Sequence, residues 1–598
     1  MVGTETKIGC QKYVTKVHNV TTDMQSKNKI ILIGILVIAF FLRLWKIESV
    51  PVSLFGDELD VGYQAYSILK TGRDYNGNFM PLHFHSLAEW RTPLYLYSAV
   101  PTVALFGITP LGVRLPAVLF GVMGIWVFYL TVKELLSYGK EYDDFHPRAL
   151  LSAFLLAISP WHIQYSRAAF EVTELLVFLL LGIYFFLKSL RNKGKTLWLS
   201  VMFFVLTPWI YSSAKLFTPF FMITIFLIFR KEIFAISKKE IIRSVLVGLI
   251  LGGPLIYSIL FGGGSQRFGY ISVFTDPAME GDVGFARLND AAVEGPERNL
   301  LQKVSSRLSH NKYVFWGDKI VDNYFSTFST NFLFNMGDLN RRHNIEGMGE
   351  LYKPDAIPLI AGVILFIAFF KNRKIKLLIL LWIILGVIPS SITRDGANHA
   401  TRLILILPPL MFLISYGLVS GYKVLHKPFN KLYILVYCFL LFVSFYLYQH
   451  NFWIHNPWYS ERWWHAGFRE TITYLKANEN EYDKIIFSNA NEPPWIFFAG
   501  WYQYSPSEWQ KGMSNAEILG FSPLKKIGKY YFGQMEEVGI YDLYKYLPEK
   551  TIYVAIEREV GLNLIREPSR VPPGLKLLKA VPYPSGEPAF YIFEKENK

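Results

Sequence analysis

The sequence contains a long series of apolar runs, and this feature limits the possible folds more than any other. A helix needs roughly 20 predominantly apolar residues to cross about 30 Å of hydrocarbon. Ile30–Trp45 is the first such run, and it is interrupted only by Arg43, whose long side chain can reach the membrane interface. Further runs lie near residues 113–135, 148–165, 171–190, 196–212, 214–230, 243–261, 356–370, 375–391, 400–419 and 430–448. The chain is therefore predicted to be an α-helical polytopic membrane protein.

The positive charges lie in short clusters between the apolar runs. The net charge is +14, but clusters placed in this way mark the cytoplasmic loops of a membrane protein and argue against a nucleic-acid partner. Following the chain by this rule puts the N-terminus in the cytoplasm and predicts eleven spans, or thirteen if a pair is hidden. Thr92–Phe106 is apolar but short and contains Pro93 and Pro101, so it is predicted to be an incomplete helix that skirts the membrane.

The same rule divides the chain into three parts of a multi-pass protein of the plasma or cell membrane. We expect a cytoplasmic tail at residues 1–28, a transmembrane domain at 29–449 and an extracytoplasmic α/β domain at 450–598. The first extracytoplasmic loop covers residues 46–91. A second, at 262–355, is too long for a plain connector, and such loops are often functional.

Patterning in the last 150 residues predicts a small α/β domain. We expect strands at Lys484–Ser488 and Thr551–Ile556, a helix at Glu461–Lys476, and two strands within Leu575–Glu594 that turn around Pro584–Gly586. This part is also dense in tryptophan and tyrosine, which stack on sugar rings or pack in a core equally well. The only cysteines of the chain, Cys10 and Cys438, provide no disulfide framework.

The segment with the strongest chemical signal is Gly56–Asp60, directly after the first apolar run. It holds three carboxylates, Asp57, Glu58 and Asp60. Acidic residues are common in the first turn of an ordinary solvated helix. Here, however, the sequence continues as an amphipathic helix that would lie along the membrane surface, so the carboxylates would be held at that surface.

Several further motifs follow in order. They are Arg91-Thr92-Pro93-Leu94-Tyr95, Leu105-Phe106-Gly107, Arg114-Leu115-Pro116 and the stretch Ala157–Glu171. This order resembles the GT-C superfamily of integral membrane glycosyltransferases, and most closely the group of protein O-mannosyltransferases (glycosyltransferase family 39) and aminoarabinose-lipid A transferases (family 83). The resemblance is good over about residues 28–230 and looser beyond. The chain departs from the family pattern in two segments. The family often has Lys-Pro-Pro where this chain has Arg91-Thr92-Pro93, and it often has an aspartate where this chain has Glu171; both changes keep the charge.

The resemblance implies a GT-C type fold and a sugar donor carried on polyprenyl or dolichyl phosphate. It implies transfer of a hexose or pentose, with inversion, to a hydroxyl of a protein, lipid or glycan acceptor on the extracytoplasmic face. Asp57 matches the catalytic acid position and would act as the base, while Glu58 and Glu171 would orient the acceptor or balance developing positive charge. The donor phosphate should face cations. The candidates are Arg91, Arg167, Lys215, Arg394, His399 and Arg402.

Other interpretations remain for these residues. Lys215 and Arg167 could be interfacial anchors, Glu171 a helix cap, and His399 a plain interface histidine. No cofactor is required, although the paired acids at 57 and 58 are compatible with a divalent cation; a zinc site at His83 and His85 is disfavoured. The loop Asn335–Asn344 is either a lid over the active site or an ordinary surface loop.

The alternative function is a transporter or flippase of lipid-linked saccharides. Such a protein would more often carry charged, broken helices at mid-bilayer in two similar halves. In a protein with a structural or assembly role, the motifs would be a coincidence.

Overall fold

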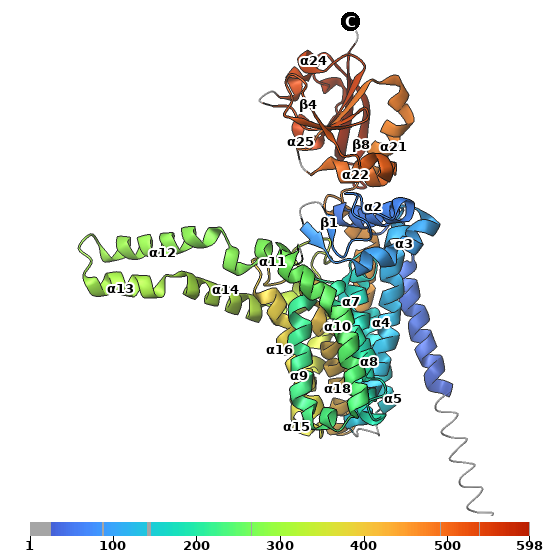
Figure 1. The fold of residues 1–598 in the computed structure, drawn as a ribbon, viewed down its shortest axis with the longest axis vertical. Coiled ribbons are helices and arrows are strands. Elements are labelled where there is room, and N and C mark those ends of the chain that lie inside the picture. Colours follow the sequence, from blue (N-terminus) through green and yellow to red (C-terminus); the bar gives the residue numbers. More distant parts are fainter. Residues whose placement is uncertain are drawn as a thin grey trace, which may run out of the picture.

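The computed structural model describes residues 26–86, 89–139, 145–262, 264, 266–490, 492–536 and 539–596. Figure 1 shows a bundle of long helices with a separate C-terminal domain at one end and a helical arm that extends sideways from the same end. The predicted polytopic helical fold and the C-terminal sheet domain are confirmed. Cys10 and most of the expected tail at 1–28 lie outside the described residues.

The bundle is built from the apolar runs of the sequence. Its helices are residues 26–44, α4 (Pro110–Gly139), α5 (Phe145–Ile158), α7 (Val172–Arg191), α8 (Leu197–Leu206), α9 (Ala214–Phe234), α10 (Lys238–Phe261), α15 (Ala356–Phe369), α16 (Arg373–Ser391), α18 (Leu407–Val424) and α19 (Phe429–His450). Within the described chain, six helical segments are both long and apolar enough to cross a membrane. Several other predicted spans do not meet both conditions. Some helices are too short, as in α8, and others carry charges at one end, such as Arg230 and Lys231 in α9.

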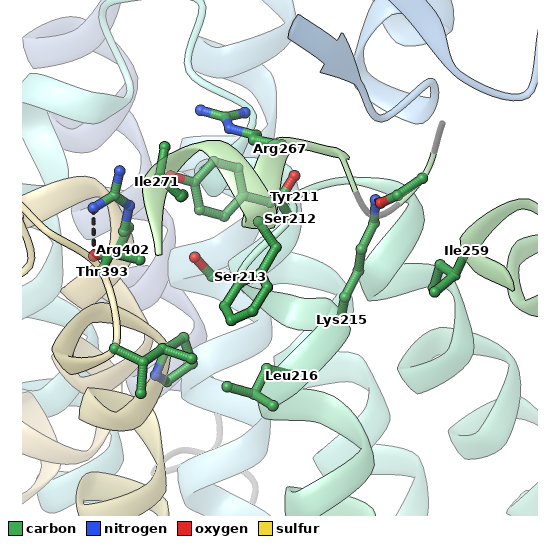
Figure 2. Close-up of a pocket in the computed structure, with 14 residues that line it drawn as sticks. Tyr211, Ser212, Ser213, Lys215, Leu216, Ile259, Arg267, Ile271, Thr393 and Arg402 are labelled. Atoms are coloured by element: carbon green, nitrogen blue, oxygen red, sulfur yellow. Dashed lines mark hydrogen bonds between the residues drawn. The ribbon is translucent and has the colours of Figure 1, made fainter. Parts of the chain in front are cut away.

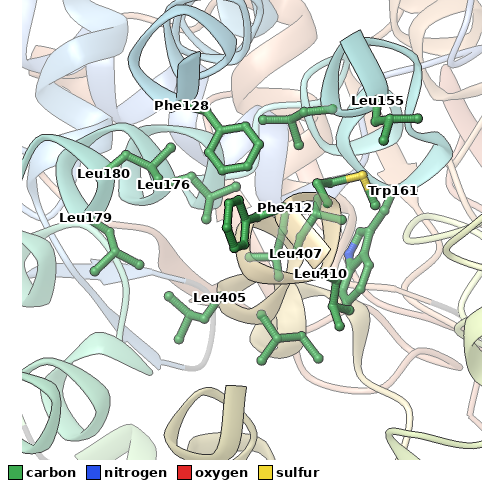
Figure 3. Packing of buried hydrophobic residues seen from close by; sticks show 14 of the residues in the cluster. Phe128, Leu155, Trp161, Leu176, Leu179, Leu180, Leu405, Leu407, Leu410 and Phe412 are labelled. Carbon is green, nitrogen blue, oxygen red and sulfur yellow. The ribbon is translucent and has the colours of Figure 1, made fainter. Parts of the chain in front are cut away.

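The bundle core is apolar and closely packed. Figure 3 shows Phe128 of α4 and Leu176 of α7 against Leu407 and Phe412 of α18. A helix that is apolar all round belongs in an interior, and α18 is almost wholly buried. By contrast, α10 leaves most of its apolar side chains exposed, as expected of a lipid-facing helix.

Short elements close the end of the bundle that carries the C-terminal domain. They are α2 (Gly56–Thr71), the hairpin of β1 (Phe84–Ser86) and β2 (Glu89–Arg91), and α3 (Leu94–Phe106). With 13 residues, α3 is too short to cross a bilayer, which agrees with the prediction for Thr92–Phe106. The helix expected after Gly56 is present, but most of α2 is buried between α3, α4 and the C-terminal domain.

The second long loop, residues 262–355, is largely helical. After α11 (Gln266–Ile271), the helices α12 (Ala278–Glu294), α13 (Leu300–Ser309) and α14 (Lys312–Ser326) form the arm in Figure 1. The chain then returns to the bundle end through a short π-helical turn, Asn331–Asn335, and an irregular loop at residues 336–352.

The C-terminal domain is a seven-stranded mixed sheet with order β4-β5-β6-β3-β7-β9-β8. Its strands are β3 (Lys484–Phe487), β4 (Ser514–Ala516), β5 (Leu524–Ile527), β6 (Tyr530–Phe532), β7 (Thr551–Ile556), β8 (Leu575–Pro582) and β9 (Pro588–Lys595). The predicted strands are thus confirmed. The predicted helix at Glu461–Lys476 starts later, as α21 (Phe468–Asn478), because Gly467 has a left-handed φ of 93° that interrupts the helix. Helix α22 (Pro494–Tyr502) follows β3 and packs on α2.

Candidate active site

A cleft of about 200 Å³ lies at the bundle end, where segments distant in sequence meet. Asp57 enters it from the first turn of α2, Arg91 from the end of β2, and Glu171 from the turn before α7. The loop 336–352 closes another side. The lining residues are Phe55, Asp57, Arg91, Ala169, Phe170, Glu171, Tyr211, Arg267, Asn340, Arg342, His343, His399 and Thr401.

Arg91 connects the carboxylates of the cleft. Its Nη2 lies 2.7 Å from Oδ1 of Asp57, its Nε 3.7 Å from Oδ2 of Asp60, and its Nη1 3.9 Å from Oε1 of Glu171. The Asp57 side chain remains 47% exposed, whereas Asp60 is buried and accepts a hydrogen bond of 2.9 Å from the Tyr75 hydroxyl. Of these acids, Asp57 is the one that a substrate can reach most easily.

The acids of the cleft differ in their protonation. Desolvation alone would raise the pKa of Asp57, but Arg91, Arg342, Arg267 and His465 together bring it below its ordinary value. Burial raises the pKa of Glu171 although Arg91 opposes the shift. Burial likewise raises the pKa of Asp60 to about 6. Asp57 is therefore an ionised carboxylate at neutral pH, which is the state that a general base requires.

Glu58 does not face this cleft. It is fully buried and pairs with the equally buried Arg114, whose Nε and Nη2 each donate to a carboxylate oxygen at 2.8 Å. The backbone N–H of Ala169 donates to Oε1 of Glu58 at 2.9 Å. The expectation that Glu58 orients the acceptor is therefore corrected: it fixes α2 to α4 and to the turn before α7.

Arg167 is also placed away from the cleft. Its guanidinium donates to four backbone carbonyls, of Leu42, Arg43, Trp45 and Val50, at 2.6–3.0 Å. It also lies over the rings of Phe452 and Trp453. With both Nη atoms bonded to backbone carbonyls, Arg167 orders the turn after the first helix, and it does not line the cleft.

A second cavity, of about 270 Å³, adjoins the cleft and is mainly apolar with cations around it. Figure 2 shows Lys215 of α9, Arg267 of α11 and Arg402 among its lining residues. Nζ of Lys215 donates to the carbonyl of Gly264 at 2.8 Å, and Arg402 donates to Oγ1 of Thr393 at 2.7 Å and Oδ1 of Asp395 at 2.6 Å. Arg267 lines both cavities. An apolar cavity with a cationic rim suits an amphipathic anion.

The two remaining predicted phosphate-binding residues, His399 and Arg394, lie in different places. His399 lines the cleft. Arg394 lines neither cavity and instead lies over the ring of Tyr270, 5.6 Å from its centroid. Lys215 and Ser258 contact the two ring nitrogens of His83 at 3.4 and 3.0 Å, and His85 is exposed.

The loop 336–352 supplies three residues of the cleft, Asn340, Arg342 and His343, that were not candidate site residues in the sequence analysis. Nδ1 of His343 lies 2.8 Å from Oδ2 of Asp338, which also accepts from the backbone N–H of Ala400 at 2.9 Å. Asp338, His343 and His399 place one ligand atom each within 4.8 Å of one another, the one such group among the described residues that could hold a metal ion. The Arg342 guanidinium lies 4.9 Å from the ring centroid of Phe55. The polar, glycine-containing segment Asn335–Asn344 was the sequence signal that pointed to this loop.

Residues 91–257 match the protein family described as dolichyl-phosphate-mannose-protein mannosyltransferase. The predicted resemblance to GT-C membrane glycosyltransferases is confirmed. The segment includes Arg91, Glu171 and Lys215, whereas Asp57 precedes it. A curated relative, YkcB of Bacillus subtilis (strain 168), is classed by its name among candidate mannosyltransferases and is 30% identical over 158 residues. The match covers 25% of this chain, and the chain spans about a fifth of that relative's length.

The solved structures that are similar to this chain include one from an archaeon and one from a bacterium. The oligosaccharyltransferase AglB of Archaeoglobus fulgidus, in complex with an inhibitory peptide and a dolichol-phosphate, is 12% identical, with 80% of this chain and 64% of that chain covered and a TM-score of 0.49. ArnT of Cupriavidus metallidurans, bound to undecaprenyl phosphate, is 10% identical, with coverage of 94% and 97% and a TM-score of 0.48.

Proposed function

We propose that this protein transfers a sugar from a polyprenyl- or dolichyl-phosphate carrier to an acceptor hydroxyl on the extracytoplasmic side of the membrane. The observation that carries the proposal is the arrangement of the two cavities. An ionised carboxylate, Asp57, lies in a polar cleft, and the cleft shares Arg267 with a mainly apolar cavity that has a cationic rim. A prenyl phosphate sugar has an apolar chain, an anionic phosphate and a polar sugar ring in this order. These parts correspond to the apolar cavity, its cationic rim and the polar cleft. The match of residues 91–257 to a family named for dolichyl-phosphate-mannose supports the same assignment.

The chemistry assigns a different task to each group. Asp57 accepts the proton of the acceptor hydroxyl as that oxygen attacks the anomeric carbon, in the manner of a general base. The bond from that carbon to the phosphate oxygen breaks, and the carrier phosphate leaves with the bonding electrons. Attack opposite to the leaving group inverts the anomeric centre.

Fixed cations stabilise the leaving phosphate. Arg267, Lys215 and Arg402 line the apolar cavity, and charge-assisted hydrogen bonds from arginine and lysine are the strong ones for phosphate. Arg91 orients Asp57 through the 2.7 Å ion pair. Asp338, His343 and His399 fit a divalent cation of the zinc type; bound there, such an ion would add positive charge to the cleft. The proton transfer and displacement described for Asp57 and the arginines do not depend on it.

A transporter is a weaker interpretation of the same residues. Transporters carry their substrate and ion sites near the bilayer midplane, on broken helices. Here Asp57, Arg91 and Glu171 lie at one end of the bundle, on elements that close it below the C-terminal domain.

The direct test uses the full chain in lipid nanodiscs. Undecaprenyl- and dolichyl-phosphate-linked hexoses and pentoses are supplied one at a time together with a mixture of protein, lipid and glycan acceptors. The reactions are run with and without divalent cations, and release of the free lipid phosphate is followed. We expect one donor to be consumed in preference to the others, because the cleft around Asp57 is small. Failure to release lipid phosphate from any member of the panel, in membranes where the chain is folded, would contradict the proposed function.

A further inference from the structure

A third pocket, of about 320 Å³, lies in the C-terminal domain at the carboxyl ends of two parallel strands. Ser488 follows β3 directly, Glu557 follows β7 directly, and both line it. Strand β3 is parallel to β6 on one side and to β7 on the other. After β3 the chain therefore forms a strand on one side of β3 and later a strand on its other side. Ligands of open α/β sheets bind outside the carboxyl ends of the strands at such a switch point.

The polar side chains of this pocket carry both signs of charge. Nη1 of Arg462 lies 3.0 Å from Oε2 of Glu557, and Nε2 of His465 lies 3.5 Å from Oε1 of Glu492. Tyr583 adds an aromatic face, with the Arg462 guanidinium 5.1 Å from its ring centroid. Arg462 and Arg558 are matched in number by Glu492 and Glu557, so the pocket has no excess of arginines over carboxylates to bind a phosphate or carboxylate ligand. Neighbouring acceptors and donors beside an aromatic ring suit a neutral, polyhydroxylated ligand, because sugar hydroxyls donate to carboxylates and accept from guanidinium groups.

The backbone is constrained where it presents His465 to the pocket. His465 has a left-handed φ of 49°, which is unusual for a residue other than glycine. Its side chain is 11% exposed, and its Nδ1 is buried without a hydrogen-bond partner among the described residues. A residue held in this conformation with an unused polar atom indicates a functional constraint.

The pocket adjoins the catalytic cleft through residues 462–465. The Arg342 guanidinium, which lines the cleft, lies 5.9 Å from the ring centroid of Trp463. The neighbouring Trp464 packs edge-on against Phe55, 5.3 Å between centroids. Electrostatics agree with this proximity, because His465 contributes to lowering the pKa of Asp57 and Arg342 contributes to lowering that of Glu492. A ligand in the pocket therefore lies on the approach to Asp57.

We infer that this pocket binds a sugar unit of the acceptor, so that the acceptor is a glycan whose adjoining hydroxyl reaches Asp57. This inference rests on the proposed transfer reaction and names its acceptor class. A peptide acceptor fits the pocket less well, because extended peptides are commonly held by the hydrogen-bonding edge of a strand, whereas the pocket lies at strand ends and offers side chains. Glu492 and Tyr583 determine specificity by holding the sugar ring.

The experiment measures binding separately from transfer. Full-length protein in nanodiscs is applied to an array of oligosaccharides and to a library of Ser- and Thr-containing peptides, and the affinity for the best oligosaccharide is then measured by titration. We expect binding to oligosaccharides, weakened about tenfold or more by Glu492→Gln and by Tyr583→Leu. Glu567→Gln is the matched control, since Glu567 is an exposed acid of the same domain paired only locally, with Arg570; it should bind like the wild type.

The outcomes separate this inference from the proposed function. Absence of oligosaccharide binding, selective binding of peptides, or equal affinity of the Glu492→Gln and Tyr583→Leu variants and the wild type would overturn the inference. Lipid phosphate release is measured on the same preparation. Release without glycan binding would overturn the pocket assignment alone, whereas glycan binding that depends on Glu492, without release from any donor, would support the pocket and contradict the transfer reaction.

Discussion

Two neighbouring residues at the start of α2 have opposite environments. Successive residues of an α-helix point about 100° apart, so Asp57 faces the cleft and is 47% exposed, while Glu58 is fully buried against Arg114. The sequence shows both as acids at the membrane surface, and only the packing of α2 on α4 separates them. Asp57 has the geometry of a catalytic group, and Glu58 that of a structural ion pair.

The Glu58→Gln substitution should therefore reduce stability. It leaves Arg114 charged and buried without its carboxylate, and breaking a buried pair from one side costs about 3–5 kcal/mol. We expect a clearly lower thermal unfolding temperature in detergent and a lower folded yield, with Glu567→Gln as an exposed control. Normal stability combined with loss of transfer would instead indicate that Glu58 takes part in catalysis.

Arg91 should set the lower pH limit of activity. Its ion pair is the largest of the charge effects that lower the pKa of Asp57, so Arg91→Gln should raise this pKa. The carboxylate of the variant then becomes protonated at a higher pH, and the acid limb of the profile of kcat/KM against pH moves upward. A variant with a lower rate but an unchanged acid limb would show that Arg91 acts without influencing the base.

Among the elements, the loop 336–352 is held by a turn that depends on glycine. Gly337 has a φ of 63°, and a Cβ at this position would collide with the Asn344 amide. That amide donates to the carbonyl of Met336 at 2.6 Å. The loop brings Asn340, Arg342 and His343 to the cleft, so the conformation of the loop and the composition of the site are linked.

The Gly337→Ala substitution should loosen this loop, and Gly347 offers a matched control. Gly347 also has a left-handed φ, of 70°, but an added Cβ meets open space. Gly347→Ala should cost about 1 kcal/mol from backbone strain alone, and Gly337→Ala more. We expect faster proteolysis within residues 336–352 and lower transfer for Gly337→Ala than for the control; equal behaviour would show that the turn does not order the loop.

The elements also show which features the sequence could predict. Apolar runs and alternation correctly predict the bundle helices and strands β3, β7, β8 and β9, because these depend on local periodicity. The motif order predicts that Asp57, Arg91 and Glu171 belong to one site, and the structure places all three in one cleft. Arg167 could not be assigned, because its partners are carbonyls more than a hundred residues away. Arg267 and Arg342 could not be singled out either, because only the return of the long loop brings them to the cleft.

At the scale of the whole molecule, the cleft, the apolar cavity and the C-terminal domain gather at one end of the bundle (Figure 1). The positive cluster Lys193–Lys195 lies between α7 and α8, and Arg373–Lys376 forms the first turn of α16. The positive-inside rule assigns both clusters to the cytoplasm. The proposed function accordingly puts the site and the C-terminal domain on the extracytoplasmic side.

Single cysteines test this orientation in a variant that lacks Cys10 and Cys438. We expect Glu567→Cys in the C-terminal domain to react with an impermeant thiol reagent added to intact cells. Lys193→Cys, between α7 and α8, should react only after the membrane is opened. The reverse pattern would contradict the proposed extracytoplasmic site.

The most direct measurement of the central claim is the rate of sugar transfer by Asp57→Asn. The substitution keeps the size of the side chain and removes the base, so we expect a folded, membrane-inserted protein that still binds the donor but transfers sugar about 10²–10⁴-fold more slowly. Transfer by this variant at a rate near that of the wild type would contradict the assignment of Asp57 as the base.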